Sequence, residues 1–215
     1  MDVEQEKRLA ATAAAELVKD GMRVGLGTGS TVAYLLPELA RLGPDAVYVA
    51  TSPSTEELAR TLALNVEAFD TLTRLDLAID GADQISADGW LVKGGGGAHT
   101  REKIVAACAD HFIVIGDSTK LVEHLHGPVP VELLSFGLNA TLRHIDPTVL
   151  RGVTLSPDGG LIGDYQGEVS DVAALARWFE ATPGVVGHGL FAPDLVSQVL
   201  VGRGNSVQRT TGEKQ

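Results

Sequence analysis

The sequence predicts an α/β protein, with a parallel sheet covered by helices and a small α+β insertion behind it. Strand-like apolar runs alternate with amphipathic helical segments through residue 120, the pattern of right-handed strand–helix–strand crossovers. The pattern changes at about Val129, where a proline-rich segment leads into short strands and helices. With 215 residues, 44% of them hydrophobic, the chain can bury a substantial core.

Apolar periodicity places the elements of the first half, and turn residues mark where each one ends. Gly21 closes the N-terminal helix and Gly43 the second one. Ser54 or Thr55 is the expected N-cap of the third helix, and Thr100 that of the fourth. In order, we expect a helix up to residue 21, a strand at 22–26, a helix at 32–42, a strand at 46–50, a helix at 54–62, strands at 65–69 and 75–79, a helix at 101–110 and a strand at 112–116.

The second half is predicted from short apolar runs separated by turn residues. The polar tail from Gly202 is expected to fray. We expect two domains, one of residues 1–127 plus 196–215 and a smaller one of residues 128–195. The expected elements are a strand at 128–134, a helix at 139–145, strands at 152–155 and 161–165, a helix at 171–182, a strand at 184–191, and a final strand at 196–201 that rejoins the first sheet.

Composition limits the classes of partner. A net charge of −11 and a pI near 4.9 argue against a nucleic-acid surface, which needs a basic face. No apolar run approaches the roughly 20 residues that span a bilayer, and acids stand where a signal peptide would be basic. Cys108 is the single cysteine, which excludes an internal disulfide and fits a reducing cytoplasm. We therefore expect a soluble cytoplasmic protein that attracts any anionic ligand locally.

The histidines do not suggest a metal site. Only His124 and His126 are close in the sequence, and their spacing suits neither one helix face nor an obvious third ligand. We expect solvated or packing roles for all six, which are His99, His111, His124, His126, His144 and His188.

The stretch 76–109 concentrates the groups that acid–base chemistry needs. An apolar strand-like run leads into Asp80 and Asp83, as a buried parallel strand leads into a catalytic loop. Lys93 precedes four glycines, whose N–H groups can face one anion because no Cβ blocks the approach. Glu102 follows in the first turn of a helix, where the helix N-terminus favours the ionised carboxylate.

A second anion site is predicted at Gly27 to Thr31, a glycine turn between a strand and a helix N-terminus. It is not the dinucleotide fingerprint, because Ser30 stands in place of the last glycine, and no Gly-Lys-Ser/Thr follows as in a Walker loop. A hydroxyl-lined turn of this kind suits a terminal phosphate, and a plain structural turn is the alternative. The hydroxyls of 51–54 lie at the carboxyl end of the next strand, where helix capping explains most of them.

Four segments together resemble ribose-5-phosphate isomerase of the A type: GLGTGST at 25–31, DGADQI at 80–85, LVKGGGGAHTREKIVA at 91–106 and IGDSTKLV at 115–122. The likeness runs from about residue 10 to 135 and continues weakly through 183–192. It implies a Rossmann-like α/β domain carrying a small α+β domain, commonly in a homodimer or homotetramer. It also implies interconversion of ribose 5-phosphate and ribulose 5-phosphate without metal or organic cofactor.

The resemblance also assigns residues, and it makes Glu102 the proton acceptor. This sequence departs from the family pattern at Gln84, where Glu is frequent, and at His99, where a leucine or similar residue is frequent. The segment 136–150 is short, and 156–160 is SPDGG where TDNGN is usual. The implied substrate contacts are Thr28, Gly29, Ser30, Thr31, Asp80, Gly81, Ala82, Asp83, Lys93, Gly94, Gly95, Gly96 and Lys120.

Aldose–ketose isomerisation moves a proton between C2 and C1 through an enediol or enediolate, so its base must be aimed at a carbon acid. Glu102 suits that role, and the glycine N–H groups with Lys93 would stabilise the developing oxyanion. Asp80 and Asp83 would serve ring opening and hydroxyl binding, and Lys120 would hold phosphate. Taken singly, each group has a plainer explanation, such as a first-turn acid, a flexible linker, a turn-forming aspartate or a surface lysine.

Two other functions stay open from the sequence. One is a phosphosugar-binding sensor module that uses the same cradle. The other is an isomerase, or a deaminase, for another sugar phosphate. A sensor needs the turn at 27–31, called the phosphate turn below, but has no use for Glu102 and Lys93 in these positions. Their joint presence therefore favours an enzyme.

Overall fold

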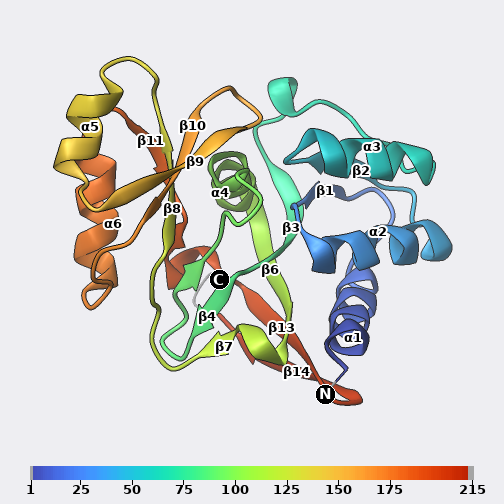
Figure 1. The fold of residues 1–215 in the computed structure, drawn as a ribbon. Helices are drawn as coiled ribbons and strands as arrows, with labels where there is room; N and C mark the ends of the chain where they lie inside the picture. The colour runs from blue at the N-terminus through green and yellow to red at the C-terminus, as the bar shows by residue number, and fades with distance from the viewer. Residues whose placement is uncertain (1, 213–215) are drawn as a thin grey trace.

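The computed structural model describes residues 2–212 and has an α/β fold built on a six-stranded sheet (Figure 1). The strand order is β14-β13-β6-β3-β1-β2, and every neighbouring pair except β13–β14 runs parallel. The parallel sheet predicted from the strand–helix alternation is confirmed. Its strands are β1 (Arg23–Leu26), β2 (Val47–Ala50), β3 (Leu75–Gly81), β6 (Ala109–Asp117), β13 (Gln198–Arg203) and β14 (Ser206–Thr211).

Helices cover both faces of this sheet, with α1 and α2 on one face and α4 on the other. Successive side chains of a strand point to opposite faces, so Val24 and Leu26 pack in the core beneath α1 and α2, whereas Gly25 faces α4. A Cβ at Gly25 would lie 2.2 Å from Val105, so the missing side chain lets α4 approach the sheet. The helices are α1 (Val3–Ala15), α2 (Ser30–Leu42), α3 (Pro53–Thr61) and α4 (His99–Cys108).

A second, antiparallel sheet in the order β11-β8-β10-β9 lies beyond α4, so that α4 sits between two sheets (Figure 1). Leu133 and Tyr165 of this sheet pack with Phe179 of α6 in a core of their own. The domain boundaries predicted at 127 and 195 stay a prediction. The elements of this part are β8 (Val129–Leu133), α5 (Leu138–His144), β9 (Thr148–Leu155), β10 (Leu161–Tyr165), α6 (Val172–Ala181) and β11 (Val185–His188).

A third sheet, β12-β5-β4-β7, was not predicted, because strands of two or three residues are too short to show an alternating pattern. Its β4–β5 hairpin brings Asp83 beside Lys93, since Asp83 N–H donates to the carbonyl of Val92 at 2.8 Å. Its strands are β4 (Gln84–Ser86), β5 (Leu91–Val92), β7 (Leu121–Val122) and β12 (Leu190–Phe191), and single 3₁₀ turns are η1 (Phe69–Thr71), η2 (Ser118–Lys120) and η3 (Pro193–Leu195).

The strand predicted at 184–191 is in fact split between two sheets at Gly189. The carbonyl of Gly189 accepts a hydrogen bond from Lys93 N–H at 2.8 Å, and its own N–H donates to the carbonyl of Pro130 at 2.7 Å. A Cβ at Gly189 would lie 2.1 Å from the Lys93 carbonyl, so a glycine is required for this close approach. The split therefore ties the second sheet to the backbone of Lys93.

The prediction of a frayed tail from Gly202 was wrong for the described residues. β14 pairs along its whole length with β13. Glu6 of α1 is fully buried, and its Oε1 accepts a hydrogen bond from the N–H of Gly204 at 2.7 Å, which anchors the hairpin turn. Partners from distant segments thus order a polar tail. The part of that prediction that concerns 213–215 lies outside the described residues.

Several helix ends differ from the predicted ones, and three of these differences concern ends that were assigned from glycine or capping residues. α1 ends at Ala15 and not at Gly21. The N-cap of α3 is Ser52, whose Oγ accepts from Thr55 N–H at 3.3 Å, because Pro53 takes the first helical position. α4 begins at His99, so Thr100 lies inside the helix. The predicted strand at 65–69 is reduced to a single bridge between Tyr48 and Val66, followed by η1.

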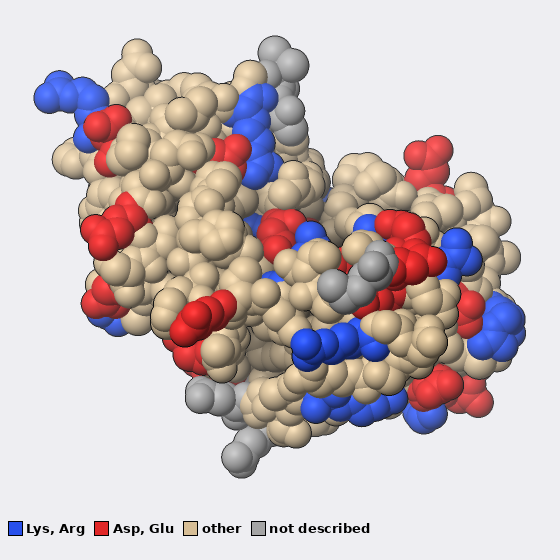
Figure 2. Space-filling model, turned by 60° about the horizontal axis from the view of Figure 1, so that its bottom comes forward, with Lys and Arg blue, Asp and Glu red and all other residues tan. Residues whose placement is uncertain are grey.

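Figure 2 shows one face of the molecule, on which acidic side chains lie beside basic ones and are not gathered in a separate patch. Within residues 2–212 no helix combines the length and the apolar character that crossing a membrane requires.

Candidate active site

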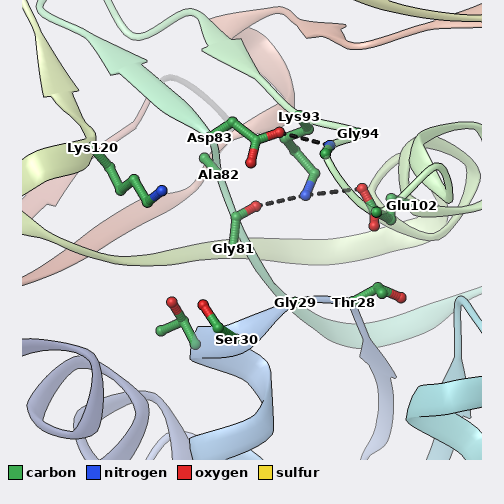
Figure 3. Close-up of a pocket in the computed structure, with 13 residues that line it drawn as sticks. Thr28, Gly29, Ser30, Gly81, Ala82, Asp83, Lys93, Gly94, Glu102 and Lys120 are labelled. Atoms are coloured by element: carbon green, nitrogen blue, oxygen red, sulfur yellow. Dashed lines mark hydrogen bonds and ion pairs between the residues drawn. The ribbon is translucent and has the colours of Figure 1, made fainter. Parts of the chain in front are cut away.

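A pocket lies where the phosphate turn after β1, the loop after β3 and the loop between β5 and α4 meet (Figure 3). The carboxyl ends of parallel strands form one edge of a sheet, so segments far apart in the sequence come together there. All of the predicted site residues except Asp80 line it: Thr28, Gly29, Ser30, Thr31, Gly81, Ala82, Asp83, Lys93, Gly94, Gly95, Gly96, Glu102 and Lys120.

The phosphate turn is open for an anion. Gly29 is the N-cap of α2 with a φ of 143°, and no side chain caps the helix, which leaves the N–H groups of its first turn available. The Thr28 hydroxyl turns away from that role and donates to Ser52 Oγ at 2.8 Å. Lys120 extends into the pocket from the side that faces Ser30 and the start of α2 (Figure 3). Helix capping by Ser52 and this hydroxyl network therefore account for the hydroxyl groups of residues 51–54, as expected from the sequence.

Lys93 is the buried centre of the site, with its side chain only 2% exposed. Its Nζ donates to the carbonyl of Gly81 at 2.6 Å and forms ion pairs with Asp80 Oδ2 at 2.8 Å and Glu102 Oε2 at 3.1 Å (Figure 3 shows the contacts to Gly81 and Glu102). The ammonium group thus donates a hydrogen bond to one carbonyl and lies between two carboxylates, of which Glu102 Oε2 is held by the ion pair alone. Without a ligand, the positive charge of Lys93 is therefore paired with the carboxylates of Asp80 and Glu102.

Asp80 lies behind this centre and does not line the pocket. Its carboxylate binds Lys93 and accepts from the N–H groups of Thr28 at 3.1 Å and Gly81 at 2.7 Å. A Cβ at Gly27 would lie 1.8 Å from the carboxylate, so the turn can pass over Asp80 only with a glycine there. Asp80 therefore connects the phosphate turn to Lys93, and the direct substrate contact predicted for it has no counterpart in the lining.

The three buried charged groups shift one another's pKa values. Burial raises the pKa of Glu102, the charge of Asp80 raises it further, and Lys93 lowers it, which leaves it at about 7. Burial also raises the pKa of Asp80 against the opposing charge of Lys93. For Lys93, burial acts to lower the pKa, but the charges of Asp80 and Glu102 prevail and raise it. A carboxylate with a pKa near neutrality suits a general base.

The glycine loop follows Lys93 directly and leads into α4. Gly94 has a φ of 104° and Gly97 a φ of 75°, the left-handed region that favours glycine. Gly95 N–H donates to Asp83 Oδ2 at 2.8 Å (Figure 3 draws Asp83 beside this loop). Within residues 2–212, the N–H groups of Gly94 and Gly96 have no protein partner. The loop thus presents free backbone donors beside Glu102, which is the arrangement of an oxyanion hole.

Comparisons with known proteins show the family of this chain. The family described as Ribose 5-phosphate isomerase A (phosphoriboisomerase A) matches residues 47–206. The ribose-5-phosphate isomerase A of Rhodopseudomonas palustris (strain HaA2) is 43% identical over 94% of this chain and 96% of its own length. This chain belongs to the ribose 5-phosphate isomerase A family.

Solved structures of ribose 5-phosphate isomerase A proteins share the whole fold. The one from Methanocaldococcus jannaschii has a TM-score of 0.90 at 34% identity, covering 95% of this chain and 97% of that one. A D-ribose-5-phosphate isomerase in complex with phospho-erythronic acid has a TM-score of 0.92 at 33% identity, covering 98% of this chain and 100% of that one. The expected fold class is confirmed by these neighbours. The comparisons give no support to a sensor module or to an isomerase for another sugar phosphate.

Gln84, which departs from the usual ribose 5-phosphate isomerase A pattern, acts away from the pocket. Its Nε2 donates to the carbonyl of His126 at 2.8 Å, and its Oε1 accepts from the N–H of His126 at 2.9 Å. An amide can both donate and accept, whereas an ionised carboxylate can only accept. The glutamine side chain therefore holds the backbone of His126, in the segment that leads into β8, by two hydrogen bonds.

The substitution Gln84→Glu is expected to lower the free energy of unfolding by about 1–3 kcal/mol, because the carboxylate faces the His126 carbonyl without a donor. Chemical denaturation near pH 8 measures the loss. Gln208→Glu, at an exposed position of β14, is the matched control and should change stability by less than about 0.5 kcal/mol. Equal stability of the two variants would contradict this role of Gln84.

His99, the other departure within the loop region, is completely buried and packs against the glycine loop. A Cβ at Gly94 would lie 2.7 Å from His99 Nδ1. Burial, with the charge of Lys103, lowers the pKa of His99 to about 3, so the imidazole is neutral.

Among the described residues, no three His, Cys, Asp or Glu side chains are arranged to hold a metal ion.

Sequence reasoning missed Arg151 and Asp164, which reach the same loop from the second sheet. Arg151 Nη1 donates to the carbonyl of Gly94 at 2.9 Å, although the two residues are 57 positions apart. No local pattern marks them, because the contact joins segments that are distant in the sequence and meet only in the fold.

Proposed function

We propose that this chain interconverts D-ribose 5-phosphate and D-ribulose 5-phosphate through an enediol or enediolate, a step of the non-oxidative pentose phosphate pathway. Membership of the ribose 5-phosphate isomerase A family supports the substrate. The observation that supports the chemistry most directly is the position of Glu102, with Oε2 3.1 Å from Lys93 Nζ on the wall of a pocket that also holds free backbone donors.

Glu102 is the proposed base. It takes the proton from C2 of the open-chain aldose and returns it to C1, while the hydroxyl proton moves between the two oxygens. The bonds made and broken balance without an external oxidant, since the aldehyde at C1 is reduced as the alcohol at C2 is oxidised. A base held by one ion pair and a helix N-terminus is fixed in position, which matters as much as its pKa.

Lys93 and the glycine loop are the proposed oxyanion stabilisers. Lys93 favours the ionised form of Glu102 before the reaction. When Glu102 accepts the proton it becomes neutral and releases its hold on the ammonium group, at the moment when negative charge appears on the substrate oxygen. The free N–H groups of Gly94 and Gly96 add donors, and one well-aimed donor contributes roughly 3–4 kcal/mol in comparable sites.

The remaining assignments follow from which groups line the pocket. Ser30, Thr31 and Lys120 hold the phosphate at the N-terminus of α2. Asp83, on the pocket wall, serves ring opening and holds substrate hydroxyls. We assign Asp80 a positioning role, because it binds Lys93 and the phosphate turn from behind.

Turnover in the presence of EDTA tests the proposed reaction. Purified protein is given ribose 5-phosphate, and formation of ribulose 5-phosphate is followed together with exchange of the C2 proton with solvent. Turnover with proton exchange is the expected result. Binding of ribose 5-phosphate without exchange, seen as protection against thermal unfolding, would overturn the enzyme and leave a binding module.

The pKa of Glu102 predicts the pH dependence of the reaction. Because burial, assisted by the charge of Asp80 and opposed by Lys93, raises that pKa to about 7, the ionised base is lost as the pH falls through this value. We expect kcat/KM to decrease about tenfold per pH unit below about 7. A pH–rate profile from 5 to 9, with unfolding measured over the same range, checks it. A flat profile between pH 5 and 8 in folded protein would contradict it.

We propose a homodimer or homotetramer in the cytoplasm, as the family resemblance implies. Exposed apolar side chains support self-association, Phe136 above all, which is 91% exposed in the loop before α5. Light scattering coupled to size-exclusion chromatography measures the assembly.

A further inference from the structure

Arg151 of β9 holds the glycine loop from the side of the second sheet. Both Nη1 protons are used, since Nη1 lies 2.9 Å from the Gly94 carbonyl oxygen and 3.0 Å from that of Gly95. Nε and Nη2 bind the two carboxylate oxygens of Asp164 on β10 at 2.8 and 2.6 Å. The bidentate pair leaves the guanidinium only one orientation, so its position is set by the second sheet.

These two carbonyls define the direction of two peptide N–H groups. In a trans peptide the C=O of one residue and the N–H of the next point in opposite directions. The Gly94 carbonyl faces Arg151, so Gly95 N–H faces the other way and donates to Asp83 at 2.8 Å. The Gly95 carbonyl also faces Arg151, so the unpartnered Gly96 N–H points away from the arginine, in a residue that lines the pocket.

A loop of consecutive glycines does not keep such an orientation by itself. Glycine adopts positive and negative φ about equally well, so a peptide plane between two glycines can turn over at little cost. A turned 95–96 plane would present a carbonyl oxygen in place of Gly96 N–H and would repel a developing oxyanion. The contact of Arg151 with the Gly95 carbonyl opposes that turn.

We propose that Arg151 is a positioning residue which fixes the Gly94–Gly95 and Gly95–Gly96 peptide planes and thereby aims Gly96 N–H at the substrate oxygen, with Asp164 holding the guanidinium. The proposal rests on the isomerase function proposed above. It gives the second sheet a part in catalysis through one side chain that touches no substrate.

Kinetics of Arg151→Gln test the proposal. We expect kcat to fall about 10–100-fold, because a displaced oxyanion donor costs up to about 10²–10³-fold. KM should stay within about threefold, since the phosphate turn lies on the other side of the pocket. Arg101→Gln is the matched control, because Arg101 of α4 makes an equally bidentate pair with Asp158 at 2.8 and 2.6 Å and does not touch the loop. A kcat for Arg151→Gln within twofold of that control would overturn the proposal.

Ligand binding gives a readout that does not depend on turnover. Phospho-erythronic acid carries a carboxylate as well as a phosphate, so it probes the loop and the phosphate turn together, whereas inorganic phosphate probes the turn alone. In Arg151→Gln we expect Kd for phospho-erythronic acid to rise about tenfold and Kd for inorganic phosphate to stay unchanged. If both rise equally, Arg151 is merely structural and the proposal fails. If the wild type binds both but has no turnover, the isomerase function fails, while the ratio of the two Kd changes still decides the role of Arg151.

Asp164→Asn decides the question if Arg151→Gln does not fold. The asparagine keeps the size of the side chain and the positive charge of Arg151, but it loosens the bidentate hold on the guanidinium. We expect a smaller loss of kcat, about 3–10-fold, again with KM nearly unchanged. An Asp164→Asn variant with the kcat of the wild type would overturn the proposal.

Discussion

Replacing Glu102 with glutamine should lower kcat by about 10³-fold or more while ribose 5-phosphate still binds. General bases contribute roughly 10²–10⁴-fold, and glutamine keeps the shape of the side chain but cannot accept a proton from carbon. The pocket wall and the phosphate turn are unchanged, so affinity is retained. The measurement is steady-state turnover of ribose 5-phosphate at pH 8, with Kd determined by calorimetry for both proteins.

Glu132→Gln is the matched control for this experiment. Glu132 is also a buried carboxylate, 2% exposed, but it lies on β8 and its Oε1 accepts from Ser156 Oγ, outside the pocket. Its kcat should stay within about threefold of wild type. If Glu102→Gln retained full turnover, another group would have to be the base.

Replacing Lys93 with methionine should have the largest effect on both stability and turnover. It leaves Asp80 and Glu102 as neighbouring buried carboxylates without a cation, and breaking a buried ion pair in this way costs about 3–5 kcal/mol. For a domain of this size that corresponds to a fall in Tm of roughly 10 °C. Turnover should be lost as well, because Glu102 would be protonated near neutral pH.

The stability deficit of Lys93→Met should depend on pH with a definite sign. Burial already raises the pKa of Glu102 and Asp80 in the wild type, and the loss of Lys93 raises both further. A carboxyl group with a raised folded-state pKa carries no penalty below its unfolded pKa and destabilises the fold as the pH rises through the folded one. Urea denaturation should therefore show the smallest deficit near pH 4 and the largest at about pH 8. A deficit that grows toward acid pH would contradict the shared ion-pair centre.

Lys103→Met is the matched control for Lys93→Met. Lys103 Nζ lies over the Phe191 ring at 5.0 Å, on the same ring that Lys93 approaches at 5.4 Å. Burial lowers the pKa of Lys103 to about 8, against a weaker opposing effect of Glu180. Because Lys103 forms no ion pair with a buried carboxylate among the described residues, its replacement should change the free energy of unfolding only slightly.

Much of the site was predictable because its chemistry lies in short segments. Asp83, Lys93 and Glu102 belong to one continuous stretch, and the glycines between them can be recognised as a backbone anion site from their lack of Cβ atoms alone. The phosphate turn was recognisable for the same reason, since a strand, a glycine turn and a helix N-terminus form an anion site locally. The parallel sheet followed from alternation of element types, which is also a local property.

Other features depended on partners that are distant in the sequence. The tail from Gly202 is polar, yet Glu6 and β13 order it into a strand. Gln84 differs from the usual residue, and only its pairing with His126 shows that the change leaves the pocket untouched.

The sequence by itself determined the fold class, the family and the residues that gather in the pocket, because periodicity, glycine turns and charged motifs act over a few residues. Only the tertiary structure decided which of those residues contact one another and which of them line the pocket. Packing placed Asp80 behind Lys93, set the ammonium group between two carboxylates and the Gly81 carbonyl, and brought Arg151 of β9 onto the glycine loop. Burial and the direction of a peptide plane depend on which surfaces meet, so no spacing of residues along the chain contains them.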